Sequence, residues 1–372
     1  MMIAAVSRMP QLDELAAQLD RLAAFEPGPF PVVSLYLNLQ ADARGRDSFG
    51  PFVRKELAAR INTFAAAPER ESLESDAVRI GAYLDAIDKT ANGLALFACK
   101  GADLFEAFQL AAPLDAHSLS VSSQPHLYPL ARLLDEYRRY LVLVADTNRA
   151  RIFVFAANEA EQKSEIEGQK TKRHKVGGMS QARYRRHTEN YHLQHAAEIA
   201  DVITRIVRDE QIDHVVIAGD QTTGARLKEQ LPKDVTERIV DVLRLNVHAS
   251  ERTIVEATLT ALREQDAETD RERVEELLGE YRANGLACVG LEHTRKALDL
   301  GQVDELVIAA APELIVKVKG GKGEGQDLTP EEQAANDLVL GARNTSASIR
   351  FIEDATIAAA IGGVGAFLRF KM

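Results

Sequence analysis

The chain has 372 residues and a formal net charge of −11, with ordinary apolar content, few aromatic residues and no tryptophan. This length exceeds one ordinary hydrophobic core and predicts two or three domains. No stretch approaches the roughly 20 apolar residues that span a bilayer, so no membrane association is expected. The acidic balance argues against a general DNA-coating protein, so any contact with nucleic acid should be local and with RNA.

The two cysteines, Cys99 and Cys288, lie in apolar, strand-like runs. Buried thiols are therefore expected rather than a disulfide or a metal-binding pair. The opening run Met1–Val6 is too short for a signal peptide. Together these features predict a cytoplasmic protein.

Apolar periodicity divides the first part of the chain, residues 1–136, into alternating helices and strands. Helices are predicted at 11–25, 51–66 and 72–88, and strands at 32–38, 94–99 and 104–110. Residues 111–129 are rich in Ser, Pro and His and are predicted to be connecting structure. This pattern indicates an α/β domain, in which the sequence offers no catalytic cluster.

Residues 137–270 form the second predicted domain. Strands are predicted at 141–144, 152–155, 214–218 and 239–243, with one helix at 223–231 and a longer one marked by Leu193, Ala196, Ala200, Ile203 and Val207. Apolar strands that alternate with helices indicate a sheet flanked by helices.

A heavily charged helical stretch, 251–284, leads into the third predicted domain, residues 271–372. Its strands are predicted at 286–289, 303–309, 348–352 and 366–370, and its helices at 292–299 and 330–340. The Gly-rich stretch 317–327 is predicted to be a surface loop. The whole chain is therefore expected to be an α/β protein of three domains.

The strongest local signal is a basic segment between residues 168 and 187. Seven Lys or Arg and no Asp or Glu lie between Lys170 and Arg186, in a chain of negative overall charge. Gly177 and Gly178 lie within the segment, and an amphipathic helical pattern follows it. Concentrated positive charge on a Gly-containing loop is typical of a segment that enters a phosphate-rich environment. The expected RNA-binding residues are Lys170, Lys172, Arg173, His174, Lys175, Arg183, Arg185, Arg186 and His187. A solvated surface loop is the alternative.

A group of histidines on the helix after this segment could be a metal site. His192, His195 and Glu198 are spaced by three. However, the helix has no His-Glu-x-x-His pattern and no nearby cysteine. Histidines on the helix surface, facing RNA or solvent, are expected instead.

Two further patterns in the second domain are weak indications of a phosphate-binding loop and of a nuclease site. Gly219–Gly224 has the glycine spacing of a phosphate loop but lacks the Lys that should follow, which indicates a strand-to-helix turn. Asp146 and Asp220 lie at strand ends, where a two-metal nuclease would place carboxylates, but no further carboxylates accompany them. A turn-forming Asp146 is the preferred interpretation, and no metal or other cofactor is expected.

Three motifs in chain order, together with the position of one strand, resemble one family. The segment Gly177-Gly-Met-Ser-Gln-Ala-Arg-Tyr-Arg-Arg-His187 resembles the Gly-Gly-Gln loop of the archaeo-eukaryotic class 1 translation release factors, and Val33–Leu37 lies where their first strand would. Cys288–Ile308 resembles the start of their third domain, and Gly362–Phe370 its closing Gly-rich strand. The chain is thus similar to a bacterial branch of this family. Relatives include pelota-type rescue factors, peptidyl-tRNA hydrolases of ribosome quality control and the hibernation factor Balon.

This resemblance implies a ribosome-binding protein. The first domain would face the decoding centre, and the middle domain, with a ribonuclease H-like fold, would carry its loop to the peptidyl transferase centre. The third domain would bind partners, such as the translational GTPase elongation factor Tu. The implied RNA partners are ribosomal RNA and peptidyl-tRNA, bound from the transfer RNA A site.

The resemblance also assigns candidate catalytic residues: Gly177, Gly178, Met179 and Gln181. Hydrolysis of peptidyl-tRNA needs a positioned water and a donor for the developing oxyanion. In the family, the backbone N–H of the loop Gln is the donor and its side chain helps to admit water. Met179 occupies that position here, so the backbone donor is kept and the polar side chain is lost. Gln181 is expected to lie already in the following helix.

Two functions therefore stay open. In the first, the protein occupies the ribosome during rescue or hibernation without chemistry, which Met179 favours. In the second, it is a peptidyl-tRNA hydrolase that releases nascent chains from stalled ribosomes. A metal-dependent nuclease is a third and weaker possibility.

Overall fold

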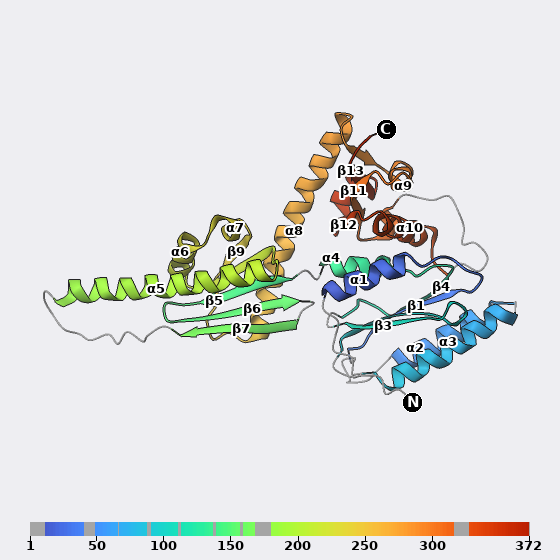
Figure 1. Ribbon diagram of the computed structural model, residues 1–372, viewed down its shortest axis with the longest axis horizontal. Helices are drawn as coiled ribbons and strands as arrows, with labels where there is room; N and C mark the ends of the chain where they lie inside the picture. The colour runs from blue at the N-terminus through green and yellow to red at the C-terminus, as the bar shows by residue number, and fades with distance from the viewer. Residues whose placement is uncertain are drawn as a thin grey trace. The chain divides into compact units, whose positions relative to one another are not determined.

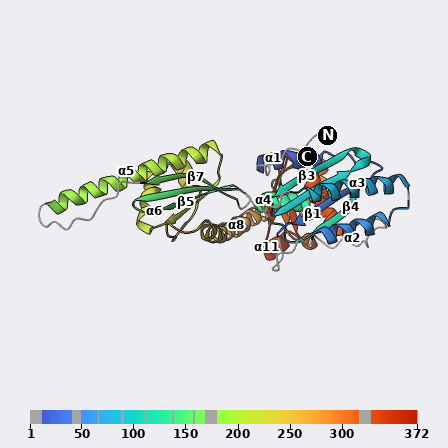
Figure 2. The same ribbon diagram turned by 90° about the horizontal axis from the view of Figure 1, so that it is seen from below.

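A computed structural model gives the fold of this protein (Figures 1 and 2). It describes residues 12–40, 49–65, 67–87, 91–110, 113–136, 139–156, 159–167, 180–315 and 327–371. These residues form three β-sheets, each covered by α-helices, as expected for an α/β chain of three domains. The chain divides into two compact units, one of Met1–Tyr137 with Ala267–Met372 and the other of Arg138–Asp266.

The N-terminal sheet of the first unit is antiparallel and has the order β3-β2-β1-β4. Its strands are β1 (Val32–Asn38), β2 (Gly93–Cys99), β3 (Leu104–Leu110) and β4 (Ser118–Ser122). Its helices are α1 (Leu12–Ala23), α2 (Phe49–Ile61), α3 (Ala67–Asp85) and α4 (Tyr128–Glu136). Alternate residues of β1, such as Leu35 and Leu37, pack against α2 and α3. The predicted strands at 32–38 and 94–99 are confirmed, and Cys99 is buried as expected.

The assignment of residues 111–129 to connecting structure was wrong for Ser118–Ser122. This segment is β4, which pairs with β1. Leu119 and Val121 are buried at alternate positions, the period of a strand. Polar serines between them obscured a signal that was present in the sequence.

The C-terminal sheet of the same unit has the order β10-β13-β11-β12, with β11 and β12 parallel. Its strands are β10 (Ala287–Val289), β11 (Val303–Ala309), β12 (Ser348–Ile352) and β13 (Val364–Leu368). Its helices are α9 (Leu291–Asp299), α10 (Pro330–Asn344), α11 (Ala355–Ala360) and the last part of α8 (Glu251–Arg282). Helix α10 begins with a capping box, in which Thr329 and Glu332 satisfy each other's backbone N–H groups.

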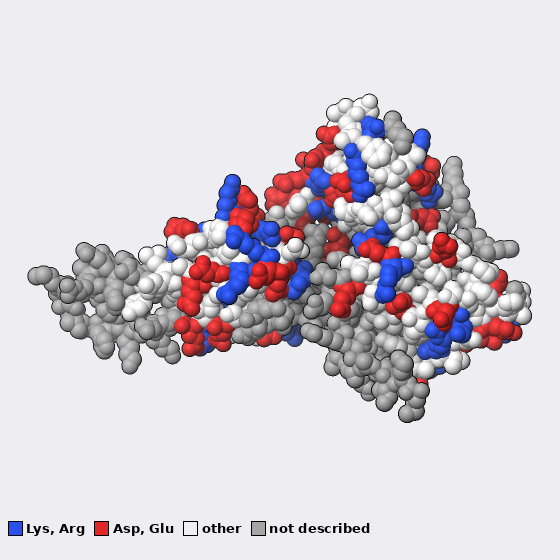
Figure 3. Space-filling view, viewed as in Figure 1, with Lys and Arg blue, Asp and Glu red and all other residues white. Residues whose placement is uncertain are grey.

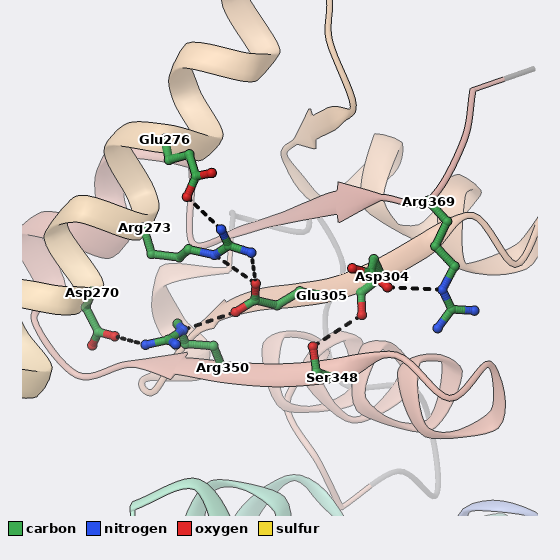
Figure 4. A network of polar contacts seen from close by, with 8 residues as sticks. All are labelled: Asp270, Arg273, Glu276, Asp304, Glu305, Ser348, Arg350 and Arg369. Atoms are coloured by element: carbon green, nitrogen blue, oxygen red, sulfur yellow. Dashed lines mark hydrogen bonds and ion pairs between the residues drawn. The ribbon is translucent and has the colours of Figure 1, made fainter. Parts of the chain in front are cut away.

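A network of charged side chains joins the last part of α8 to this sheet (Figure 4). Arg273 on α8 donates to Glu305 on β11 through Nε at 2.8 Å, and Arg350 on β12 donates to Glu305 at 3.1 Å. Arg350 also donates to Asp270 of α8 at 3.1 Å. Because Glu305 is 12% exposed, water screens these ion pairs only weakly.

The second unit contains a five-stranded sheet of order β7-β6-β5-β8-β9. Its strands are β5 (Tyr140–Ala145), β6 (Arg149–Ala156), β7 (Glu159–Glu167), β8 (His214–Gly219) and β9 (Ile239–Leu243). The first three strands are antiparallel, whereas β8 runs parallel to β5 and β9 parallel to β8. Three antiparallel strands followed by two that return parallel to the first are the ribonuclease H-like arrangement that the resemblance implied.

Helices cover both faces of this sheet. The helices of the unit are α5 (Ser180–Asp209), α6 (Gln221–Gln230), the short α7 (Lys233–Thr236) and the first part of α8. Leu141 and Leu143 of β5 face the core that includes α5 and α6, whereas Val142 and Val144 face Ile254 of α8. In the part of the chain that the structure describes, no helix is long and apolar enough to cross a membrane.

Candidate nucleic-acid interface

The helix that follows the basic segment has a clear inner face. Among the positions of α5 whose burial the structure describes, the buried ones are spaced as a helix face requires: His195, Ala196, Ile199, Ala200, Ile203 and Val207. The apolar ones pack against Leu141 and Leu143 of the central strand. The predicted apolar face is confirmed for Ala196, Ala200, Ile203 and Val207, which fix the side of α5 that faces the sheet. It was wrong for Leu193, which is 45% exposed because it lies just before the buried part of the helix begins.

The first turns of α5 extend beyond the end of the sheet (Figures 1 and 2). The helix has 30 residues and β7, which precedes it in the sequence, has 9. At about 1.5 Å per helical residue and about 3.3 Å per strand residue, the helix is about 45 Å long and the strand about 30 Å. A short strand thus leads into a long helix, whose first turns lie away from the core.

Several predicted site residues lie outside the described residues. These are Gly177, Gly178, Met179, Lys170, Lys172, Arg173, His174 and Lys175. The structure describes the two ends of the connection that contains them, Glu167 at the end of β7 and Ser180 at the start of α5.

The remaining predicted residues lie in the projecting turns of α5: Gln181, Arg183, Arg185, Arg186 and His187. The prediction that Gln181 already belongs to the helix is confirmed. Arg183, Arg186 and His187 occupy positions three and four apart in one continuous helix, which is the spacing of residues on one side. The positive charge predicted from the sequence therefore continues into the part of α5 that extends past the sheet.

Acidic and basic residues are interspersed over the described surface of the second unit in the view of Figure 3. Arg149, for example, is paired with Glu165 at 3.4 Å and also with Glu167. Interspersed charges give little long-range field. The sequence between β7 and α5 is therefore where positive charge is most concentrated in this domain.

A turn at the end of β5 anchors α5 to the sheet. The Oδ1 of Asp146 accepts hydrogen bonds from the backbone N–H groups of Asn148 at 2.7 Å and Arg149 at 2.8 Å. The turn-forming role predicted for Asp146 is thus confirmed. A ring nitrogen of His192 lies 3.2 Å from the carbonyl oxygen of Thr147, so α5 is attached to this turn just before its buried face begins.

The expectation that the histidines of α5 lie on its surface was wrong for His195. Its side chain is 7% exposed, and neither ring nitrogen has a hydrogen-bond partner in the described structure. Burial lowers the pKa of His195, although the carboxylates of Glu198 and Asp146 oppose that shift. His195 immediately precedes the buried Ala196 on the inner side of α5. The helical periodicity of the sequence could therefore have predicted its burial. Within the described residues, no group of three or more His, Cys, Asp or Glu is arranged to hold a metal ion.

Gly219–Gly224 is a strand-to-helix turn, as predicted: β8 ends at Gly219 and α6 begins at Gln221. Gly219 has φ +138°, and a Cβ there would lie 1.9 Å from the carbonyl oxygen of Ala145. The position therefore requires glycine. Asp220 accepts a long hydrogen bond from the hydroxyl of Thr223 at 3.5 Å.

Sequence reasoning also missed the role of residues 113–136. Asn336 of α10 binds backbone groups of this segment, and Tyr128 donates to the carbonyl oxygen of Ala309 on β11. The segment therefore forms part of the contact between the N-terminal and C-terminal parts of the first unit. No local pattern could have found it, because its partners lie about two hundred residues away in the sequence.

Two protein families match adjacent parts of this chain. The family described as "Bacterial archaeo-eukaryotic release factor family 10" matches residues 125–263, and "eRF1 domain 3" matches residues 267–372. The first match contains the basic segment and the ribonuclease H-like sheet, and the second contains the C-terminal sheet. The chain is an archaeo-eukaryotic release factor-like protein.

Individual proteins are similar to this chain at low identity. Peptide chain release factor subunit 1 of Archaeoglobus fulgidus is 24% identical over 294 residues, which cover 70% of this chain and 72% of that protein. Eukaryotic peptide chain release factor subunit 1 of Stylonychia mytilus is 25% identical over 284 residues, 66% of this chain and 64% of that protein. Among solved structures, Archaeoglobus fulgidus Pelota aligns over 100% of this chain and 99% of its own, with 13% identity and a TM-score of 0.37.

Proposed function

We propose that this protein is a translation factor that binds the ribosome in the transfer RNA A site and acts in ribosome rescue or hibernation. Its relatives in the family are peptide chain release factors. In this proposal the segment around Gly177 and Gly178 is directed at peptidyl-tRNA. Ribosomal RNA and peptidyl-tRNA are its RNA partners.

One observation supports this proposal most directly. Helix α5 extends beyond its sheet directly after Gly177-Gly178-Met179, and its first turns contain Arg183, Arg185 and Arg186. The first four N–H groups of any α-helix have no partner within the helix, and the helix dipole makes this end attractive to phosphate. A helix whose basic end lies away from the core is suited to reach a crowded RNA cavity.

The start of α5 favours occupancy over hydrolysis. Because the helix begins at Ser180, Gln181 lies in its first turn, so it could replace the family's loop glutamine only if that turn unwound. Met179 supplies a backbone N–H but no polar side chain for a water. We therefore propose a factor that holds the A site without chemistry, with an active peptidyl-tRNA hydrolase as the alternative.

The remaining domains have proposed roles in the same complex. Residues 1–136 would face the decoding centre, 137–270 the peptidyl transferase centre, and 271–372 a protein partner. The match of 267–372 to the third domain of release factors supports that assignment. A translational GTPase such as elongation factor Tu is the proposed partner.

A peptide-release experiment tests this function. Ribosomes carrying a labelled peptidyl-tRNA in the P site and an empty A site are mixed with the wild type, Met179→Gln or Gly178→Trp. Co-sedimentation and peptide release are followed together. The proposal predicts binding without release for the wild type, release gained in Met179→Gln, and weaker binding for Gly178→Trp, because a bulky side chain obstructs entry.

The other outcomes are equally informative. Release by the wild type that is lost in Gly178→Trp would establish the hydrolase instead. Absence of co-sedimentation for all three proteins would remove the ribosomal function.

A further inference from the structure

The elements on both sides of the basic segment are held by one hairpin turn, Asp146–Arg149, which joins β5 to β6. Arg149 is paired in the sheet with Glu167, the last residue of β7, and their side chains form an ion pair. Beyond the segment, Nδ1 of His192 on α5 lies 3.2 Å from the carbonyl oxygen of Thr147. The strand that leads into the segment and the helix that follows it therefore meet at the same turn.

The carboxylate of Asp146 sets the shape of this turn. Its Oδ1 accepts hydrogen bonds from the backbone N–H groups of Asn148 and Arg149, and its own N–H donates to the carbonyl oxygen of Arg149 at 2.9 Å. An Asp that bonds its own backbone in this way holds a turn in one conformation. Asp146 thereby fixes the direction of the Thr147 carbonyl oxygen, which is the acceptor that faces His192.

The base of the turn belongs to the packed centre of the sheet. Ala145, the last residue of β5, is 1% exposed, and its carbonyl oxygen accepts from the backbone N–H of Asp220 at 3.4 Å. Gly219 of β8 approaches the same oxygen closely, because a Cβ at Gly219 would lie 1.9 Å from it. The turn therefore connects α5 and β7 to the part of the core where β5 and β8 lie side by side.

A contact at His192 has leverage over the start of α5. Ser180, where α5 begins, precedes His192 by about twelve residues, which is about 18 Å of helix. A tilt of about 10° at His192 would therefore move the start of the helix by about 3 Å. Because a carbonyl oxygen can only accept, the ring nitrogen that faces Thr147 must carry the proton.

We propose that Asp146 and His192 are positioning residues, which set the direction in which the arginine-containing start of α5 is presented to RNA. His192 holds the helix, and Asp146 holds the carbonyl oxygen to which His192 donates. Neither side chain has to contact RNA for this role. The inference rests on the proposed ribosome binding, and it names residues outside the basic segment that orient the interface.

Paired variants of the full chain test this role. Asp146→Ala removes the acceptor of two backbone N–H groups, whereas Asp146→Asn keeps an oxygen that can accept them. His192→Phe keeps a ring but loses the donor, whereas His192→Asn offers an amide nitrogen at about the position of Nδ1. Asp201→Ala and His248→Phe, at exposed positions of the same unit, are the matched controls.

Two measurements are made on each variant. Hydrogen exchange of the free protein is followed at residues 184–191 of α5 and, for comparison, in β5 and β8. Co-sedimentation with ribosomes that have an empty A site gives the affinity. Exchange reports the positioning of the helix without ribosomes, so failure of the proposed function can be recognised separately.

We expect Asp146→Ala and His192→Phe to speed exchange at residues 184–191 about 5-fold or more, as the loss of one partly buried hydrogen bond predicts. Exchange in β5 and β8 should stay unchanged, and ribosome affinity should fall about 3-fold or more. The two Asn variants should restore both properties at least in part, and the controls should stay within about 2-fold of the wild type.

Three results would overturn the positioning role. These are unchanged exchange at residues 184–191, equally faster exchange throughout the unit, and faster exchange at 184–191 with unchanged ribosome affinity. If the wild type did not bind ribosomes at all, the proposed function would be wrong, and exchange alone would decide whether Asp146 and His192 hold the helix.

Discussion

The Oδ1 of Asn336 accepts a hydrogen bond from the backbone N–H of Leu127 at 2.7 Å, which joins positions 209 residues apart. The same oxygen accepts from the N–H of Tyr128 at 3.3 Å, and Nδ2 of Asn336 donates to the carbonyl oxygen of Pro125 at 3.1 Å. Asn336 is 1% exposed, so these bonds are made away from water. One side chain of the C-terminal domain therefore holds the backbone of the segment that enters α4.

Replacing Asn336 should destabilise the first unit. In Asn336→Ala, the N–H of Leu127 and the carbonyl oxygen of Pro125 lose a buried partner, which should lower the free energy of unfolding by about 2–4 kcal/mol. Urea denaturation measures the change, and hydrogen exchange should become faster at Leu127 and Tyr128. Asn344→Ala, at an exposed position of the same helix, is the control and should stay within about 0.5 kcal/mol of the wild type. Equal effects of the two variants would contradict this account.

Glu305 should matter more than its neighbour Glu276. Both accept hydrogen bonds from Arg273, but the side chain of Glu305 is 12% exposed and that of Glu276 is 59% exposed. Glu305→Ala leaves Arg273 and Arg350 without their shared partner, which should cost about 2–4 kcal/mol of stability. Glu276→Ala should cost less than about 1 kcal/mol. Denaturant titration of both variants checks the order, and a reversed order would refute the role assigned to Glu305.

Acid should destabilise the first unit through His126. Burial lowers its pKa to about 4 in the folded chain, below the value near 6.5 of an exposed imidazole. As the pH falls from about 6.5 to 4, the unfolded chain binds a proton that the folded chain does not, so stability is lost across that range. The contribution should be about 3 kcal/mol at most.

The variant His126→Phe isolates this contribution from that of the carboxylates. Its stability should fall less than that of the wild type when the pH is lowered from 7 to 4. His293→Phe, at an exposed position of the same unit, should follow the wild-type curve. Parallel curves for the wild type and His126→Phe would show that His126 does not titrate in this way.

The three arginines near the start of α5 should set the salt dependence of ribosome binding. Arg183→Ala/Arg185→Ala/Arg186→Ala should weaken co-sedimentation about 10-fold or more and should flatten the decrease of affinity with salt, by roughly 0.7–0.9 per lost phosphate contact. The control, Arg205→Ala/Lys228→Ala/Lys233→Ala, removes the same charge from exposed positions elsewhere in the unit. If both triple variants lost affinity equally, net charge rather than the projecting turns would govern binding.

The sequence predicted those features that depend on local pattern. The apolar run of β1 and the helical period of α5 were recognisable, and the structure has both elements. Strand β7 was not predicted, because its sequence Glu-Ala-Glu-Gln-Lys-Ser-Glu-Ile-Glu is that of a polar edge strand with little apolar alternation. Ion pairs of Arg149 with Glu165 and Glu167 join it to β6 instead.

Features that depend on distant contacts could not be predicted in the same way. The contact of Asn336 with residues 125–128 forms only when the N-terminal and C-terminal parts of the first unit pack together. The composition of the basic segment could be read from the sequence. Its position between a short edge strand and a long projecting helix could be seen only in the structure. The roles of Gly177, Gly178 and Met179 stay predictions, as do the domain boundaries at 136 and 270.

The central claim is that this protein occupies the transfer RNA A site, and competition tests it most directly. Labelled protein is titrated with ribosomes that carry peptidyl-tRNA in the P site and either an empty A site or a stably bound A-site transfer RNA. We predict saturable binding to the first and at least about 10-fold weaker binding to the second. Equal affinity for both ribosomes would place the protein elsewhere and contradict the account.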